Sequence, residues 1–174
     1  ARKRSKPRSS SRGASPVVPI SSPPSAATTA ERWEPYDQLL FATGARPVRP
    51  PFEGIASRNI YDVHNLVNGS QLKRALAEQQ PRSAVIIGGG YLGLEMAEAL
   101  HLRGLHITMV QRSPQVMSTF DPEMGQRLNR ALLDHGIELC VNETIQGFEQ
   151  QEGLAARVQQ GDGALDVGDG LRLV

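Results

Sequence analysis

An apolar segment that runs directly into a glycine-rich turn constrains this chain more than any other feature. Residues 84–87 are Ala-Val-Ile-Ile, and they are followed by the pattern Gly88-x-Gly90-x-x-Gly93. Glycine is needed at these positions for separate reasons: the first permits a tight turn, the second lets the backbone approach a pyrophosphate, and the third lets a helix pack close to the strand. The helix that follows directs its free N–H groups and the positive end of its dipole at the phosphates. The pattern predicts a dinucleotide site.

The sequence after the turn supports this prediction. Apolar residues at helical spacing predict a helix that ends at Gly104, and residues 107–110 form a second apolar run. The helical set consists of Leu92, Met96, Ala99 and Leu100. Strand, helix and strand together make the βαβ unit that the glycine pattern requires, which predicts a Rossmann-like parallel sheet.

The remaining elements fit an α/β protein. We predict a first strand at residues 36–42, an irregular stretch at 57–66 and a helix near residues 69–80. That helix carries Leu72, Ala75 and Leu76 on one face.

A third helix is expected to begin at Asp121 and Pro122, which read as an N-cap and a first helical residue, and to end at His135 and Gly136. Its inward residues should be Met124, Leu128, Ala131 and Leu132.

Residues 137–141 should form the third parallel strand. Short strands at 144–148, 154–158 and 171–174 should form an antiparallel ribbon. The predicted fold is α/β: a Rossmann-like, three-layer parallel sheet with short antiparallel strands.

Composition separates the first thirty residues from the rest. They contain six of the 19 basic residues and no acid, so the remainder carries 13 basic and 18 acidic residues, a net charge of −5. We therefore expect a disordered tail at residues 1–32 and no nucleic-acid-binding face beyond it. The tail resembles a transit peptide, or it is a basic arm that touches nucleic acid or acidic membrane, or it has no selected role.

Three further features limit the class of protein. No run of about 18 apolar residues occurs, so no membrane span is expected. The one cysteine, Cys140, excludes an internal disulfide and is typical of a cytoplasmic protein. The four histidines show no ligand spacing, so no metal site is expected.

A second motif brings a family into view. The pattern Tyr36-Asp37-x-Leu39-x-x-Ala42-Thr43-Gly44-x-x-Pro47 stands about forty residues before Gly88-Gly89-Gly90-Tyr91-Leu92-Gly93-Leu94-Glu95. The pair, within residues 33–150, resembles the FAD-dependent pyridine nucleotide-disulfide oxidoreductases. It is most similar to their branch of coenzyme A disulfide reductases, NADH oxidases and ferredoxin or rubredoxin reductases.

The resemblance implies roles for particular residues. Thr43 and Gly44 would lie against FAD, and the glycine turn would hold the NAD(P)H pyrophosphate. Tyr91 would cover the flavin ring until nicotinamide displaces it, and Glu95 would orient the cofactor or a partner lysine. Tyr91 could instead be a packed residue at the start of the helix, and Glu95 a solvated charge.

The end of the second strand bears on the choice of coenzyme. A carboxylate there would bind the ribose hydroxyls of NAD, whereas a cation would accept the 2′-phosphate of NADP. The chain has Gln111 and Arg112 at this point, which favours NADPH. Gln111 could still hydrogen-bond a ribose, and Arg112 could stack on adenine.

The sequence also departs from the family. Residues 1–32 contain neither the glycine loop of a flavin-binding unit nor its redox cysteines. This mismatch favours a tail without a selected role. We expect a tail at 1–32, a remnant of a flavin domain at 33–56 and an NAD(P)H-binding domain at 57–174. No catalytic set is complete, so the truncated chain should bind NAD(P)H weakly and catalyse little without a flavin domain or protein electron acceptor. The alternatives are a non-catalytic dinucleotide-binding module and a nucleic-acid or surface binder that uses the basic tail.

Overall fold

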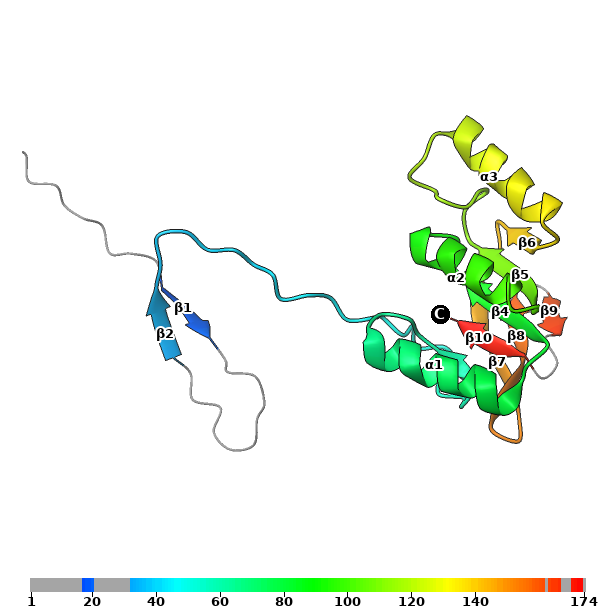
Figure 1. Ribbon diagram of the computed structural model, residues 1–174, viewed down its shortest axis with the longest axis horizontal. Coiled ribbons are helices and arrows are strands. Elements are labelled where there is room, and N and C mark those ends of the chain that lie inside the picture. Colours follow the sequence, from blue (N-terminus) through cyan, green and yellow to red (C-terminus); the bar gives the residue numbers. More distant parts are fainter. Residues whose placement is uncertain (1–16, 21–31, 162, 167–169, 174) are drawn as a thin grey trace, which may run out of the picture. The chain divides into compact units, whose positions relative to one another are not determined.

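The structure is a computed structural model that describes residues 17–20, 32–161, 163–166 and 170–173 (Figure 1). The chain divides into two compact units, residues 1–45 and 46–174. In the first unit, β1 (Val17–Ile20) pairs with β2 (Arg32–Pro35) in antiparallel fashion. The tail expected to be disordered over residues 1–32 includes β1 and the first residue of β2, and its other residues lie outside the described part.

The strand predicted at residues 36–42 is absent. This stretch is irregular, and residues 37–42 are exposed. Strand conformation needs a neighbour for the backbone N–H and C=O groups, and none of the described strands pairs with these residues. An apolar sequence alone could not supply that partner.

The second unit is built on a parallel sheet of five strands in the order β3-β10-β4-β5-β6. The strands are β3 (Ile60–Tyr61), β10 (Leu171–Leu173), β4 (Ser83–Ile87), β5 (His106–Gln111) and β6 (Glu138–Val141). The parallel strands β4, β5 and β6 lie where the sequence predicted them. Two features differ from the prediction: β10 joins this sheet instead of the antiparallel ribbon, and β3 lies in a stretch expected to be irregular.

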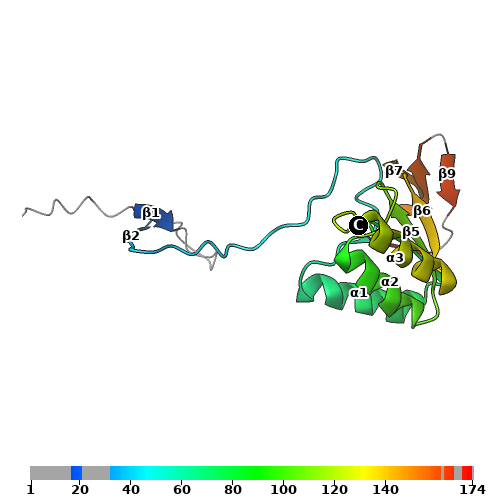
Figure 2. The same cartoon turned by 90° about the horizontal axis from the view of Figure 1, so that it is seen from above.

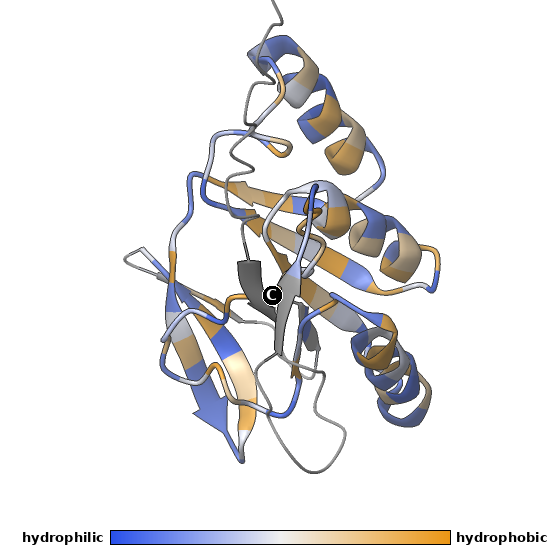
Figure 3. Ribbon diagram, turned by 90° about the vertical axis from the view of Figure 1, so that its left-hand side faces the viewer, coloured by the Kyte–Doolittle hydropathy of each residue, from blue (hydrophilic) through white to orange (hydrophobic). Residues whose placement is uncertain are grey.

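The unit has three layers (Figure 2). The helices α1 (Leu66–Gln79), α2 (Tyr91–His101) and α3 (Pro122–Asp134) cover one face of the parallel sheet. The antiparallel strands β7 (Ile145–Gln151), β8 (Leu154–Gln160) and β9 (Gly163–Asp166) cover the other (Figure 3). The three-layer α/β fold is therefore confirmed. Within the described residues, no helix is long and apolar enough to cross a membrane.

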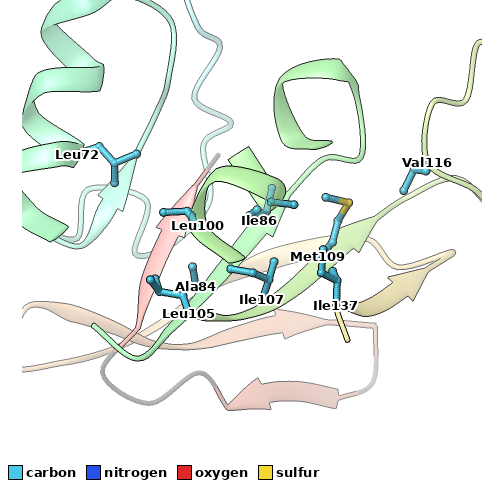
Figure 4. Packing of buried hydrophobic residues seen from close by; sticks show 10 residues of the cluster. Leu72, Ala84, Ile86, Leu100, Leu105, Ile107, Met109, Val116 and Ile137 are labelled. Carbon is cyan, nitrogen blue, oxygen red and sulfur yellow. The ribbon is translucent and has the colours of Figure 1, made fainter. Parts of the chain in front are cut away.

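Alternation along the central strands explains the layers. Ala84 and Ile86 of β4 pack with the helices, whereas Val85 packs against the antiparallel sheet. On β5, Ile107 and Met109 face the helices and Val110 faces the other layer. Figure 4 shows the helix-side cluster. Because successive side chains point to opposite faces, a strand that is apolar throughout is buried on both sides.

Helix α1 begins earlier than predicted because Asn65 caps it. The Asn65 side chain accepts a hydrogen bond from the Asn68 N–H at 3.0 Å. Leu72 and Ala75 are buried and Leu76 packs against the core, as predicted.

The predicted inward face of α3 is partly wrong, and the apolar residues at helical spacing in α2 are not all buried. In α2, Ala97 and Leu100 are buried, while Leu92 and Ala99 are exposed. In α3, Leu128 and Leu132 pack against the core, but the residue that is fully buried is Gly125. Met124 and Ala131 are exposed. The spacing of apolar residues predicts a helix. Which side of the helix faces the core depends on which side chains fit against the neighbouring layer.

The antiparallel sheet is attached by Asn59. Its side chain accepts from the Ala155 N–H at 2.8 Å and donates to the carbonyl oxygens of Ala155 and Gly170 at 3.1 and 3.2 Å. Asn59 is buried and links β8 to the residue that precedes β10. One side chain therefore joins the antiparallel layer to the parallel one.

Candidate functional site

The glycine turn lies at the carboxyl end of β4, near the middle of the parallel sheet. Strands β5 and β6 follow one another on one side of β4, while β10 and β3 lie on its other side. The strand order therefore reverses beside β4. In open α/β sheets, ligands bind outside the carboxyl ends of the strands at such a point.

The four glycines of residues 88–93 serve different purposes. Gly88 has φ of +102°, a conformation that other residues rarely adopt. A Cβ at Gly89 would lie 2.7 Å from Cγ1 of Val116, and a Cβ at Gly93 would collide with the carbonyl oxygen of Gly88. Gly88 therefore allows the turn, Gly89 the close approach of the loop after β5, and Gly93 the close approach of α2 to β4.

Gly90 differs from the other three. Its φ is −83°, it is exposed, and an added Cβ would meet nothing within 4 Å. The fold of the turn does not require glycine here. A side chain at position 90 would extend into open space in front of the helix.

The N-terminus of α2 offers unsatisfied donors. Gly90 is its N-cap and supplies no side-chain acceptor, and the first turn contains no acidic residue. By contrast, Asn65 caps α1, and Asp121 caps α3 by accepting from the Met124 N–H at 2.9 Å. The first N–H groups of α2 and the positive end of its dipole are therefore available to an anion.

A pocket of about 390 Å³ opens at this end of α2. Its lining is mostly apolar and comprises Val63, Ile86, Ile87, Gly88, Gly90, Tyr91, Leu92, Gly93 and Met96. Tyr91 is 67% exposed and Leu92 is 57% exposed, so neither is a packed core residue. Glu95 lies one helical turn after Tyr91 and is exposed, and it has no ion pair with any described residue.

Gln111 and Arg112 lie at the carboxyl end of β5, beside the turn. Oε1 of Gln111 accepts a hydrogen bond from the Gly89 N–H at 2.9 Å, and Gln111 is half-buried. The Arg112 side chain is exposed. The structure brings together the predicted residues of the turn, the start of α2 and the end of β5.

The loop after β5 contributes contacts that the sequence did not predict. The Met117 N–H donates to the carbonyl oxygen of Gly89 at 2.7 Å. Asn129 on α3 holds this loop by accepting from the Val116 N–H at 3.0 Å and donating to the carbonyl oxygen of Pro114 at 3.3 Å. These contacts depend on how the loop folds back, and no periodicity in the sequence encodes that path.

Thr43 and Gly44 belong to the other unit, residues 1–45. Both are exposed in an irregular stretch, and Gly44 has φ of +74°. The predicted flavin contacts are therefore the only predicted site residues outside the unit that carries the glycine turn.

Other reactive groups lie apart from the turn. Cys140 on β6 is half-buried, and its pKa is raised by burial and by the nearby carboxylates of Glu143 and Glu138. Among the described residues, no group of three or more His, Cys, Asp or Glu side chains is arranged to hold a metal ion.

The fold and the turn define a Rossmann-type α/β domain with the glycine loop of dinucleotide-binding proteins. The chain belongs to the pyridine nucleotide-disulphide oxidoreductase family, whose profile matches residues 24–172.

Named relatives agree with this assignment. An NADH oxidase of Methanocaldococcus jannaschii is 32% identical over 122 residues, which cover 70% of this chain and 27% of the oxidase. The crystal structure of reduced CoADR-RHD from Bacillus anthracis is 31% identical, with a TM-score of 0.72, and the match covers 84% of this chain and 26% of that one. This chain thus spans about a quarter of the length of these relatives.

A third relative is an engineered protein. It is a water-forming NADPH oxidase bound to NADPH, derived by five substitutions from an NADH oxidase of Lactobacillus brevis. It is 26% identical to this chain, with a TM-score of 0.69, and the match covers 84% of this chain and 32% of that one.

Proposed function

We propose that this chain is the NAD(P)H-binding part of a flavin-dependent oxidoreductase. In such an enzyme, hydride passes from NAD(P)H to FAD and then to a disulfide, oxygen or a protein acceptor. Family membership supports the reaction class, and the glycine turn supports the part that this chain plays in it.

The observation that carries the proposal is the open space at Gly90. Three glycines of the turn serve the fold, whereas Gly90 leaves bare backbone facing the pocket. A diphosphate that lies on this backbone would accept hydrogen bonds from the first N–H groups of α2. A glycine that the fold does not need is explained by a ligand that approaches the main chain.

The lining of the pocket suits the rest of a reduced coenzyme. Tyr91 and Leu92 extend from the first turn of α2 and line the pocket, where Tyr91 would give way to the nicotinamide ring when the coenzyme binds. The bound coenzyme supplies a hydride, and the protein's task is to hold and orient it. Glu95 is placed one turn further along the helix and is our candidate for orienting that ring or a partner lysine.

We propose NADPH as the preferred coenzyme, with Arg112 binding its 2′-phosphate. In the engineered NADPH oxidase, an aspartate is replaced by alanine and the next two residues by arginine and serine. This chain has Gln111 in place of an acid, followed by Arg112 and Ser113.

The spacing within that engineered protein supports the correspondence. One of its replaced residues is a glycine eighteen positions before the aspartate, and Gly93 lies eighteen positions before Gln111. The engineered protein has alanine at that glycine, whereas this chain keeps Gly93, so the match holds at the strand end and not at the turn.

The test is to titrate NADPH and NADH separately and to follow the fluorescence of the reduced nicotinamide. Arg112→Ala should weaken NADPH binding about tenfold or more, because it removes a charge-assisted hydrogen bond. NADH binding should change little. Arg103→Ala removes an exposed arginine in the turn that precedes β5, whereas Arg112 follows the end of that strand, and is the matched control. Equal affinities for both coenzymes, unchanged by Arg112→Ala, would defeat the NADPH assignment.

The flavin part of the reaction needs more than this chain offers. Among the described residues, Thr43 and Gly44 are the only candidate contacts for FAD, and two residues do not make a flavin site. We therefore expect the chain alone to bind coenzyme without turning it over. A flavin domain or a protein electron acceptor is the expected partner, and turnover after FAD alone is added would contradict this expectation.

A non-catalytic dinucleotide-binding module is the second candidate function. It shares the open Gly90 and the uncapped α2, so coenzyme binding does not separate the two. Transfer of hydride from bound NADPH to an added flavoprotein partner would favour the enzyme. The basic arm proposed to bind nucleic acid or a surface lies within residues 1–16, outside the described part of the chain.

A further inference from the structure

The peptide groups of Gly89 are held on both sides. Its N–H donates to Oε1 of Gln111 at 2.9 Å, and its carbonyl oxygen accepts from the Met117 N–H at 2.7 Å. Gly89 is buried, and Val116 closes the space where a side chain would project. The middle of the glycine turn is therefore fixed by the end of β5 and the loop after it, independently of any ligand.

This contact fixes the orientation of the Gln111 carboxamide. The Gly89 N–H can only donate, so the oxygen of the amide must face it and the NH₂ group must face away. The Nε2 atom carries two donors and no acceptor. A glutamate at this position would also accept from Gly89, but it would direct a second, charged oxygen outward.

The position of Gln111 in the fold gives its outward-facing Nε2 a possible ligand. The end of the second strand of a Rossmann unit is where the ribose next to adenine lies. A 2′-phosphate there has acceptors only and carries negative charge. The exposed Arg112 adds five further donors, so the two side chains together present donors without any acceptor.

We propose that Gln111 both positions the glycine turn, through Oε1 on the Gly89 N–H, and selects NADPH, through Nε2 donating to the 2′-phosphate. This inference rests on the proposed function, because it assumes that a dinucleotide lies on the turn. It adds that one neutral side chain couples the shape of the turn to the choice of coenzyme.

Two substitutions separate the two roles. Gln111→Glu keeps an oxygen for Gly89 and replaces the outward donor with a carboxylate, so it should lower the affinity for NADPH about tenfold or more relative to that for NADH. Gln111→Met removes both groups at similar length. Hydrogen exchange of the Gly89 amide in the full chain without ligand should be faster in Gln111→Met and unchanged in Gln111→Glu.

The controls make these results specific. Gln79→Glu adds the same charge on an exposed residue at the end of α1, shortly before the amino end of β4, and should leave the NADPH-to-NADH ratio unchanged. The amides of Val85 and Met109 report any general loss of stability. A merely structural role would lower both affinities together, without a change in their ratio.

The outcomes are distinct. If Gln111→Glu keeps the wild-type ratio of affinities, or if Gln111→Met leaves Gly89 exchange unchanged, the inference is overturned. If the wild-type chain binds neither reduced coenzyme, the proposed function and the selective role of Gln111 both fail. The exchange rates then still decide whether Gln111 holds the turn.

Discussion

At the scale of single residues, the glycines of the turn differ in what the fold requires of them. The reasons given for Gly88 and Gly93 agree with the positive φ of the first and the close helix contact of the second. The sequence could not predict the contacts of Gly89 with Gln111 and Met117. They join residues 22 and 28 positions apart, and Met117 itself has a left-handed φ of +46°. Such contacts follow from the path of a loop, which side-chain type does not reveal.

Cys140 gives a residue-level prediction about pH. Burial and the carboxylates of Glu143 and Glu138 raise the pKa of its thiol above the ordinary value of 9.0. The folded protein thus favours the neutral thiol, which is the less reactive form. We expect iodoacetamide to alkylate Cys140 more slowly in the folded chain than in urea-unfolded chain at the same pH.

The same shift predicts the direction of a stability change. Because the pKa is higher in the folded state, the stabilising contribution is complete below the unfolded-state pKa and is lost as pH rises through the folded-state value. The free energy of unfolding should therefore fall more steeply above about pH 9 in the wild type than in Cys140→Ala. Equal slopes, together with equal alkylation rates in folded and unfolded chain, would count against the assigned environment.

At the scale of elements, periodicity predicted which segments are helices and strands but not how they are turned or joined. The exposed Leu92 and the buried Gly125 show that the rotation of α2 and α3 depends on the neighbouring layer. The apolar run at the end of the chain was predicted as a strand, yet β10 enters the parallel sheet between β3 and β4. A three-residue strand carries too little pattern to indicate its neighbours.

A substitution at Asn59 tests whether its hydrogen bonds hold the two sheets together. Asn59→Ala removes three hydrogen bonds and leaves backbone groups of Ala155 and Gly170 without that partner in a buried place. We expect it to lower the free energy of unfolding by about 2–4 kcal/mol. Urea denaturation measures this, with Gln146→Ala on the exposed face of β7 as a control expected to change stability by less than about 0.5 kcal/mol. A loss no larger than that of the control would contradict the role of Asn59.

At the scale of the whole molecule, the unit of residues 46–174 is a layered domain that brings the predicted residues of the dinucleotide site to one end of its sheet. The chain covers only about a quarter of the length of the relatives reported above. The sequence was sufficient for the fold class and the family, whereas the position of the site stays a prediction. The contacts that hold the glycine turn depend on how the loop of residues 113–120 packs against it, and the sequence does not reveal this packing.

The most direct test of the central claim is calorimetric titration of NADPH into the wild-type chain and into Gly90→Leu. The added side chain meets open space at an ordinary φ, so the free energy of unfolding should change by less than about 1 kcal/mol. We expect saturable heat for the wild type and none for the variant, because leucine would occupy the place of the diphosphate. No heat with the wild type, or equal affinity in the two proteins, would show that no diphosphate lies on the main chain at Gly90.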